Sequence, residues 1–378
     1  MRKQYDVAVI GGGPAGYVAA IKAAQLGGRA AVFEKSVLGG TCLNRGCIPT
    51  KCYLKTAELM EEIAGCTQRG IVLDAHPSVD LPKAVAHKNS VVKKLTEGVA
   101  GLLRSHKIDV YYGEAALATE NTLTCGGETY GFDSVLLCGG SKPGVIPIPG
   151  AESKNVLDSD ALLDLEALPR RLAIIGGGVI GCEMAAAFHG FGSQVTVIEA
   201  MDRLVPPMDE EISAQLKKSL EKKGIRVLTS QKVSAIQDQG TGSTVLCQDG
   251  TRVEADKILI CVGRAADLDC LGALKDRIRL ERGKVSAMAG EAAFRYVEKA
   301  IRLAMDHEID GTVTNAINKE AINLAGHHYS GHTEIYADMT QTKEYTMMLA
   351  HENLRVVHVS THVSLREACD RVKNGKGA

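Results

Sequence analysis

The sequence predicts an α/β protein with two doubly wound domains, each built on a parallel sheet, followed by a partial α/β module. The first observation is an internal repeat: residues 5–35 align without a gap to residues 170–200, at an offset of 165. Each copy has an apolar strand, a glycine-rich turn, an alanine-rich helix, a second strand and a final glutamate. This order of elements is typical of parallel α/β sheets. The second observation is composition, because 40 glycines and no tryptophan in 378 residues fit an α/β enzyme with many tight turns.

Charge and hydropathy exclude several classes of protein. The chain has 44 basic and 45 acidic residues, which implies no general attraction to nucleic acid or to an anionic membrane. Asp6 and the early glycines interrupt the core that a signal peptide would need, and no apolar run approaches transmembrane length. We therefore expect a cytoplasmic protein whose thiols stay reduced unless chemistry requires otherwise.

Both copies of the repeat carry the G-x-G-x-x-G pattern between a strand and a helix. The first glycine permits the tight turn, the second lets the backbone approach a pyrophosphate, and the third lets the helix pack on the strand. A pyrophosphate then lies at the helix N-terminus, where free N–H groups favour an anion. The matching residues are Gly11, Gly13 and Gly16 in the first copy, and Gly176, Gly178 and Gly181 in the second.

A glutamate lies 18 residues after the last glycine of each pattern, at Glu34 and Glu199. Each carboxylate is expected to accept hydrogen bonds from ribose hydroxyls, and an acid here favours NAD over NADP because it would repel a 2′-phosphate. Two such sites in one chain indicate two dinucleotides, and FAD plus NAD is the obvious pair. The alternative is a glycine-rich turn that binds no ligand.

Other segments suggest the domain boundaries. We expect an FAD domain over residues 1–145, an NAD domain over 146–284 and the partial module over 285–378. LLCGGSKP would return the chain under the first cofactor, and KILICVGRAADLD would play the same part in the second domain. The stretch SKPGVIPIPG, residues 141–150, reads as the linker between the domains.

Two cysteines lie five residues apart in GGTCLNRGCIPTK, residues 39–51. In a regular helix, Cα atoms five residues apart are about 8.6 Å apart, and a disulfide needs less than about 7 Å. Cys42 and Cys47 can therefore form a disulfide only if the backbone departs from a helix, and the neighbouring glycines and proline allow this. A disulfide in such a turn would be reducible and catalytic. The alternatives are half of a metal site, although no second pair at metal spacing accompanies it, or two unpaired core cysteines.

The remaining nine cysteines follow no metal or redox spacing. We expect them to be small buried hydrophobic residues. They are Cys52, Cys66, Cys125, Cys138, Cys182, Cys247, Cys261, Cys270 and Cys369.

The cysteine motif and both glycine patterns together resemble the flavoprotein disulfide reductases, and within them most closely the dihydrolipoyl dehydrogenases, over residues 1 to about 284. By that resemblance, Cys42 would be the thiol that attacks lipoamide, and Cys47 would lie against the flavin. Lys51 would lie near flavin N5 and pair with Glu183. The further residues that would contact FAD are Gly113, Gly139, Gly140 and Ser141, and Gly263 would face NAD.

The same resemblance implies an electron path from dihydrolipoamide to the disulfide, then to FAD and then to NAD. The partner would be dihydrolipoamide or a lipoyl-bearing protein, with no nucleic acid and no membrane. A thiolate beside an oxidised flavin and a cation is chemically sensible, because both lower its pKa. Glutathione and mercuric reductases share the cysteine motif, but Glu199 favours NAD.

The chain departs from that family after residue 284. Family members have a second FAD motif ending in Gly-Asp, and this sequence contains no Gly-Asp dipeptide. They also have a dimerisation domain with a His-Pro-Thr motif whose histidine acts as a base across the homodimer. HPSVD, residues 76–80, mimics that motif but lies too early, and we interpret it as a loop. We expect weak FAD retention and little lipoamide turnover.

Residues 285–378 instead contain TNAINKEAINLAG, SGHTE and THVSLRE. These phrases resemble the 4-hydroxythreonine-4-phosphate dehydrogenases and their threonate- or erythronate-phosphate relatives. That family holds a divalent metal with three histidines. By resemblance, His332 and His362 would be two of the ligands, and the alternative is that they are surface or loop residues. The chain thus resembles a fusion of two truncated enzymes.

Three functional hypotheses follow from these features. The first is an FAD- and NAD-dependent disulfide oxidoreductase of dihydrolipoyl dehydrogenase type, impaired by truncation. The second is a metal- and NAD-dependent phosphohydroxy-acid dehydrogenase that works through the C-terminal module. The third is a nucleotide-binding remnant without catalysis. Absorbance of bound flavin and two substrate assays separate them.

Overall fold

The structure is a computed structural model, and it describes residues 3–72, 77–272, 283–314, 316–343, 345–346, 348–351, 354–357 and 366. The chain forms two compact units, Met1–Asp276 and Arg277–Ala378. The predicted limits at residues 145 and 284 stay predictions.

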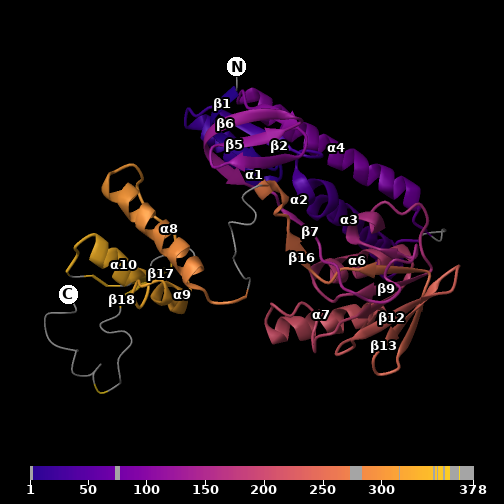
Figure 1. The fold of residues 1–378 in the computed structure, drawn as a ribbon. Coiled ribbons are helices and arrows are strands. Elements are labelled where there is room, and N and C mark those ends of the chain that lie inside the picture. Colours follow the sequence, from indigo (N-terminus) through magenta and orange to yellow (C-terminus); the bar gives the residue numbers. More distant parts are fainter. Residues whose placement is uncertain are drawn as a thin grey trace. The chain divides into compact units, whose positions relative to one another are not determined.

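The first sheet of the larger unit has six strands in the spatial order β3-β2-β1-β6-β5-β4. Strands β1, β2, β5 and β6 are labelled in Figure 1. Strands β3, β2, β1 and β6 run parallel, while β5 and β4 are antiparallel additions. The strands are β1 (Lys3–Ile10), β2 (Ala30–Glu34), β3 (Asp109–Tyr112), β4 (Ala115–Thr119), β5 (Thr122–Cys125) and β6 (Glu128–Leu137).

Both faces of this sheet are covered at β1 and β2, which explains why the end of β1 and most of β2 are continuous apolar runs. Val9 and Val32 face α1 (Pro14–Gln25) and α4 (Leu81–Ser105) in one core cluster. The alternate residues of the same strands, among them Ile10 and Phe33, pack against β4 and β5 on the other face. The alternation follows from the two-residue period of a strand.

The second sheet repeats the first in its parallel part, with the order β11-β10-β9-β15-β8. Helix α6 (Val179–Phe191) covers one face, and an antiparallel sheet of β12, β13 and β14 covers the other. The strands are β8 (Val156–Leu157), β9 (Arg171–Ile175), β10 (Gln194–Ile198), β11 (Arg226–Leu228), β12 (Val233–Asp238), β13 (Ser243–Cys247), β14 (Arg252–Ala255) and β15 (Lys257–Ile260).

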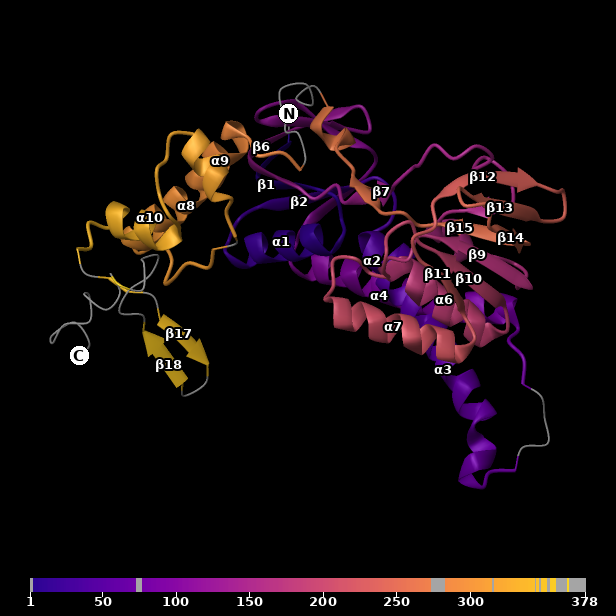
Figure 2. The same ribbon diagram turned by 90° about the horizontal axis from the view of Figure 1, so that it is seen from below.

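Helix α3 (Cys47–Ala64) of the first half packs on α6 of the second, and the two lie side by side in Figures 1 and 2. Lys51 of α3 contacts Glu183 of α6, and Ala57 lies against Gly190, so the helices run parallel with their N-termini together. The other helices of this unit are α2 (Gly40–Arg45), the 3₁₀ turn η1 (Cys66–Arg69), α5 (Ser159–Leu162) and α7 (Glu210–Lys223).

The predicted linker begins as a strand. β7 (Ser141–Pro143) pairs antiparallel with β16 (Arg264–Ala266), so the outgoing and returning chains form a two-stranded ribbon between the sheets. Further along, the Ile236 N–H donates to Pro149 O, and a Cβ at Gly150 would lie 2.0 Å from Ile236 O. The linker therefore contacts the second half at several points, although residues such as Val145 are exposed.

The smaller unit contains three helices and a hairpin among its described residues. Phe294, Val297, Ile301, Ile322 and Ile335 form its buried core. Its elements are α8 (Ala287–Met305), α9 (Lys319–Leu324), α10 (His332–Met339), β17 (Met348–His351) and β18 (Leu354–Val357).

The predicted class, α/β with parallel sheets in two Rossmann-like halves, is confirmed. Within the part of the chain that the structure describes, no helix is long and apolar enough to cross a bilayer.

The contact between α3 and α6 gives a test of packing. A Cβ at Gly190 would lie 2.5 Å from the Ala57 Cβ, so Gly190→Ala should overpack the helices and destabilise the protein by about 1–3 kcal/mol. Gly98, inside α4, has open space around its Cβ position, so Gly98→Ala should instead gain up to about 1 kcal/mol of helix propensity. Urea unfolding of both variants measures the opposite shifts, and equal midpoints would refute the close contact.

Candidate functional site

The carboxyl ends of four parallel strands meet at one edge of the first sheet. Gly11 follows β1, Glu34 ends β2, Gly113 follows β3 and Gly139 lies just beyond β6. The Gly11 N–H donates to Phe33 O at 2.7 Å, and the Gly113 N–H donates to Glu34 O at 2.9 Å. The structure thus gathers the residues predicted for FAD where ligands bind in open α/β sheets.

The first and third glycines of each pattern have reasons within the protein. Gly11 has φ +108°, and a Cβ there would lie 2.1 Å from Cys138 O. A Cβ at Gly16 would lie 1.8 Å from Gly11 O. In the second copy, Gly176 has φ +117°, and a Cβ at Gly181 would lie 1.9 Å from Gly176 O.

The second glycine of each pattern faces space instead. A Cβ at Gly13 would touch only Gly40, at 3.5 Å, and one at Gly178 would meet nothing within 4 Å. Both residues are N-caps without a side-chain hydrogen bond, at the starts of α1 and α6. Since packing does not require these two glycines, both loops fit a group that approaches the backbone, as a pyrophosphate would.

The two glutamates tie their own loops together. Glu34 accepts from the Gly12 N–H at 2.7 Å and from the Ser36 N–H at 2.8 Å. Glu199 accepts from the Gly177 N–H at 2.5 Å and from the Met201 N–H at 2.7 Å. Each carboxylate oxygen retains a second lone pair that is available to a ribose hydroxyl. Binding of a ribose by either glutamate stays a prediction.

The repeat continues past the region that aligns without a gap. The Gly39 N–H donates to Gly12 O at 2.8 Å, and the Val205 N–H donates to Gly177 O, also at 2.8 Å. The offset is now 166, one residue more than before. Val205 has φ +41° where its counterpart Gly39 has φ +94°, and a valine in this region is strained. The sequence did not indicate that position 205 corresponds to position 39, because the first is a valine and the second a glycine.

The two candidate redox cysteines meet at a break between helices. Helix α2 ends at Arg45, Gly46 has φ −135° and ψ −108°, and α3 starts at Cys47. The predicted departure from a regular helix is therefore present. Cys42 and Cys47 both carry free thiols, and the two lie close enough for Cys47 to raise the pKa of Cys42. Cys42 is half-buried and Cys47 is exposed.

Lys51 lies beside this dithiol. Its Nζ is 2.6 Å from Glu183 Oε1, which is the ion pair that the resemblance implied. The hydrogen bond to Glu183 is the main cause that raises the pKa of Lys51, and both cysteines add to it. The pKa of Cys42 is raised, first by the hydrogen bond to Cys47 and then by burial, while the Lys51 charge opposes the rise. The pair therefore supplies a fixed cation to a developing thiolate.

The dithiol turn also adjoins the first glycine loop. Gly40, the first residue of α2, has φ +56°, and a Cβ there would lie 2.6 Å from the Gly13 Cα. A side chain at position 40 would thus collide with the residue that faces the open space. This contact is one that the cysteine motif alone did not reveal.

Gly140, Ser141 and Gly263 lie around the ribbon of β7 and β16. Arg264 Nε donates to Ser141 Oγ at 2.8 Å, and the Gly144 N–H donates to Gly263 O at 2.9 Å. Gly140 and Gly263 both have positive φ, at +72° and +116°. Their assigned contacts to FAD and NAD stay predictions.

The expectation of burial for the other cysteines is half right. It holds for Cys66, Cys125, Cys182 and Cys247. It is wrong for Cys52, Cys138, Cys261 and Cys270, which are half-buried, and Cys369 lies outside the described residues. Cys138 and Cys261 follow equivalent strands, where their carbonyls pack against Gly11 and Gly176, and such positions lie at the partly open edge of a sheet.

The described residues of the smaller unit include no set of ligands for the expected metal. No group of three His, Cys, Asp or Glu side chains that could hold an ion occurs among the residues that the structure describes. His332 begins α10, and its buried Nε2 has no hydrogen-bond partner. His362 lies outside the described residues. The metal site stays a prediction, and we derive no chemistry through it.

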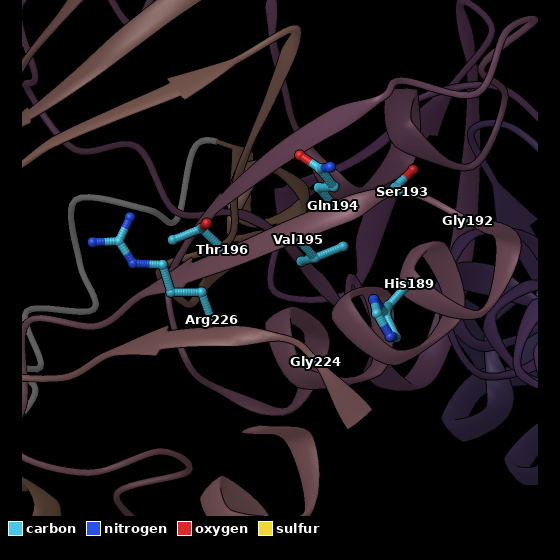
Figure 3. Close-up of a pocket in the computed structure, with 8 residues that line it drawn as sticks. All are labelled: His189, Gly192, Ser193, Gln194, Val195, Thr196, Gly224 and Arg226. Atoms are coloured by element: carbon cyan, nitrogen blue, oxygen red, sulfur yellow. The ribbon is translucent and has the colours of Figure 1, made fainter. Parts of the chain in front are cut away.

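An open pocket lies elsewhere on the second sheet (Figure 3). Gln194 and Val195 come from the start of β10 and Arg226 from the start of β11, while His189 comes from the last turn of α6. These are the amino ends of the strands, opposite to the glycine loop. The pocket is thus separate from the candidate nucleotide site.

The chain matches a known protein family over most of its length. The family described as pyridine nucleotide-disulphide oxidoreductase matches residues 5–289. The chain belongs to this family.

The curated relatives that resemble this chain include several named dihydrolipoyl dehydrogenase. The chain is 41% identical over 290 residues to a dihydrolipoyl dehydrogenase of Acholeplasma laidlawii, covering 74% of this chain and 85% of the relative. It is 42% identical over 273 residues to one of Bacillus subtilis strain 168, covering 70% and 59%. Another, from Thermus scotoductus, is 41% identical over 295 residues, covering 76% and 63%.

A solved structure with the same fold is the copper(II) complex of a mutant of the HOCl-induced flavoprotein disulfide reductase RclA from Escherichia coli. It has a TM-score of 0.65 at 30% identity, and the match covers 75% of this chain and 61% of that one. The chain thus spans about three fifths of the length of RclA and of the Bacillus and Thermus relatives.

A second family, described as pyridoxal phosphate biosynthetic protein PdxA, matches residues 211–376. This match includes the phrases that resembled 4-hydroxythreonine-4-phosphate dehydrogenases. It begins earlier than expected and overlaps the first family over residues 211–289.

The position of Lys51 predicts how the dithiol responds to pH. Lys51→Met removes the charge that lowers the pKa of Cys42, so less thiolate exists at a given pH, and iodoacetamide should alkylate Cys42 severalfold more slowly near neutral pH. Mass spectrometry of the reduced protein from pH 6 to 10 measures the rate. Lys55→Met is the matched control, since Lys55 pairs with the exposed Glu58 on the same helix. Equal profiles for Lys51→Met and wild type would contradict the assignment.

Proposed function

We propose that the protein is an FAD-dependent pyridine nucleotide-disulfide oxidoreductase of dihydrolipoyl dehydrogenase type. One observation carries the proposal: the Cys42 and Cys47 thiols meet at a helix break, beside the Lys51–Glu183 ion pair and against the first glycine loop. The relatives named dihydrolipoyl dehydrogenase support the type of reaction.

The first glycine loop, with Gly11, Gly13 and Glu34, would hold FAD. Gly113 and Gly139 lie at the ends of the neighbouring strands, and Ser141 begins the adjoining ribbon strand β7. The second loop, with Gly178 and Glu199, would hold NAD. When bound, the flavin supplies two-electron transfer between the dithiol and the nicotinamide. The parallel packing of α3 on α6 supports this arrangement, because it brings the dithiol near the start of the helix that follows Gly178.

The proposed disulfide exchange uses Cys42, Cys47 and Lys51. In the oxidised protein, a thiolate of dihydrolipoamide attacks Cys42 Sγ, the Cys42–Cys47 bond breaks, and Cys47 leaves as a thiolate. The second substrate thiol loses its proton to solvent and attacks the mixed disulfide, which releases lipoamide and the Cys42 thiolate. Two electrons pass from substrate to protein, and Lys51 balances the negative charge that develops.

The substrate is proposed as dihydrolipoamide or a lipoyl-bearing protein, on the names of the relatives. The match to the PdxA family keeps a phosphohydroxy-acid dehydrogenase as the second candidate. Its metal ligands are represented among the described residues by His332 alone, so the disulfide oxidoreductase is favoured.

Absorbance spectroscopy tests the proposal. After reconstitution with FAD, addition of dithiothreitol should give a long-wavelength band, because a thiolate then lies beside the oxidised flavin. Cys47→Ser should retain FAD and lose the band, whereas Cys66→Ser, at a buried cysteine outside the turn, should keep both. FAD binding without a band in wild type would leave a nucleotide-binding protein, and an absence of FAD binding would overturn the proposal.

The two open glycines predict a reciprocal pair of variants. Gly13→Ala should weaken FAD binding by about tenfold or more while NAD binding persists, because its Cβ enters space that only a ligand uses. Gly178→Ala should do the reverse. Calorimetric titration with each nucleotide measures both affinities, and each variant is the control for the other. Loss of the same nucleotide in both variants would reject the assignment of one loop to each cofactor.

A further inference from the structure

Lys88 is a buried lysine that none of the steps above uses. It lies within α4, and its side chain is 3% exposed. A buried ammonium is costly unless hydrogen bonds and charge compensate it. Its Nζ donates to Leu163 O at 2.9 Å, forms an ion pair with Asp164 Oδ1 and lies 5.9 Å from the centre of the Tyr53 ring.

Tyr53 donates to the same carbonyl. Its hydroxyl lies 2.6 Å from Leu163 O, and its side chain is 1% exposed. The ring packs edge-on against Phe188 and Phe191 of α6, with centroids 6.3 and 5.4 Å away. One carbonyl oxygen thus accepts from two side chains, which come from α3 and α4.

That carbonyl belongs to the second half of the larger unit. Leu163 is the C-cap of α5, in the connection that leads to β9, and it is buried in the same core as α6. The C-terminal end of a helix favours a cation. Lys88 and Tyr53 therefore attach the helix pair α3–α4 to the connection between strands β8 and β9 of the second sheet.

The redox residues start on the same helix. Tyr53 is two residues beyond Lys51 and six beyond Cys47, and two residues in a helix turn by about 200°. Lys51 is held from α6 through Glu183, while Tyr53 is held from the α5 end through Leu163. The Tyr53 ring also packs on Phe188 and Phe191 of α6, so both side chains are held at that helix and Tyr53 is held in addition by Leu163. Together these contacts fix the rotation of α3 about its axis, and this rotation sets where the Lys51 Nζ lies relative to the dithiol.

We propose that Tyr53 and Lys88 are positioning residues for the dithiol, acting through Lys51. By sharing Leu163 O, they hold α3 in the rotation that keeps the Lys51 ammonium beside Cys42 and Cys47. The proposal deepens the disulfide oxidoreductase function proposed above and rests on it for its biological meaning. Its chemistry concerns the thiols of this chain and needs no bound cofactor.

The test uses the reactivity of the thiols in the reduced full-length protein. Tyr53→Phe removes only the hydroxyl, and Lys88→Met removes the charge while keeping a long side chain. Each should slow alkylation of Cys42 by iodoacetamide near neutral pH by roughly threefold, and its pH profile should move to higher pH. In a Lys51→Met background, neither substitution should slow it further. The control is Lys94→Met, at an exposed lysine of the same helix.

Two results would overturn the proposal. One is an unchanged alkylation profile in variants that melt as cooperatively as the wild type. The other is the same slowing in the Lys51→Met background, which would show that the junction acts on structure alone. If Lys88→Met does not fold, Tyr53→Phe decides, since it keeps the ring between Phe188 and Phe191. Because the assay contains neither flavin nor lipoamide, failure of the proposed function would appear separately, as loss of FAD binding or turnover.

Discussion

The packing of α3 on α6 is the contact on which the arrangement of the site depends. Gly190 lets the two helices approach until a single added carbon at that position would lie 2.5 Å from Ala57. Because the helices run parallel, this approach also brings their first turns together. One first turn carries Cys47 and leads to Lys51, and the other follows Gly178 and leads to Glu183. The ion pair between the two helices follows from the backbone packing.

The two halves of the larger unit share the same glycine loop and glutamate, and they differ in the segment that follows. In each, a glycine turn follows the first strand, and a glutamate from the next strand closes it. The two halves differ after Gly39 and Val205, whose N–H groups donate to the carbonyl oxygens of Gly12 and Gly177. In the first half the glycines at 39 and 40 start the helix with Cys42, whereas in the second half Val205 is followed by two prolines. The turn that carries Cys42 and Cys47 is thus an extension of a loop that both halves share.

Sequence reasoning was strongest where the chemistry is local. The glycine turns and the helix break at Gly46 depend on residues within a few positions of one another, so spacing predicts them. The repeat was found because its two copies align without a gap. The Lys51–Glu183 pair came from resemblance, since 132 residues separate its members. The junction at Leu163 O had no such signal, because tyrosine and lysine in helices are common and the acceptor is a backbone atom. Half-burial of Cys138 and Cys261 was missed because sequence does not show which end of a strand lies at an open edge.

The carboxylates of Glu34 and Glu199 carry a consequence for how ligands arrive. Each already binds two backbone N–H groups, so the loop around it is held in shape by the protein itself. Ordering a flexible segment on association normally reduces affinity, because conformational freedom is lost at that moment. Here that entropy is lost when the chain folds. A nucleotide would enter a cradle that is already set, and its exchange requires little rearrangement of the main chain.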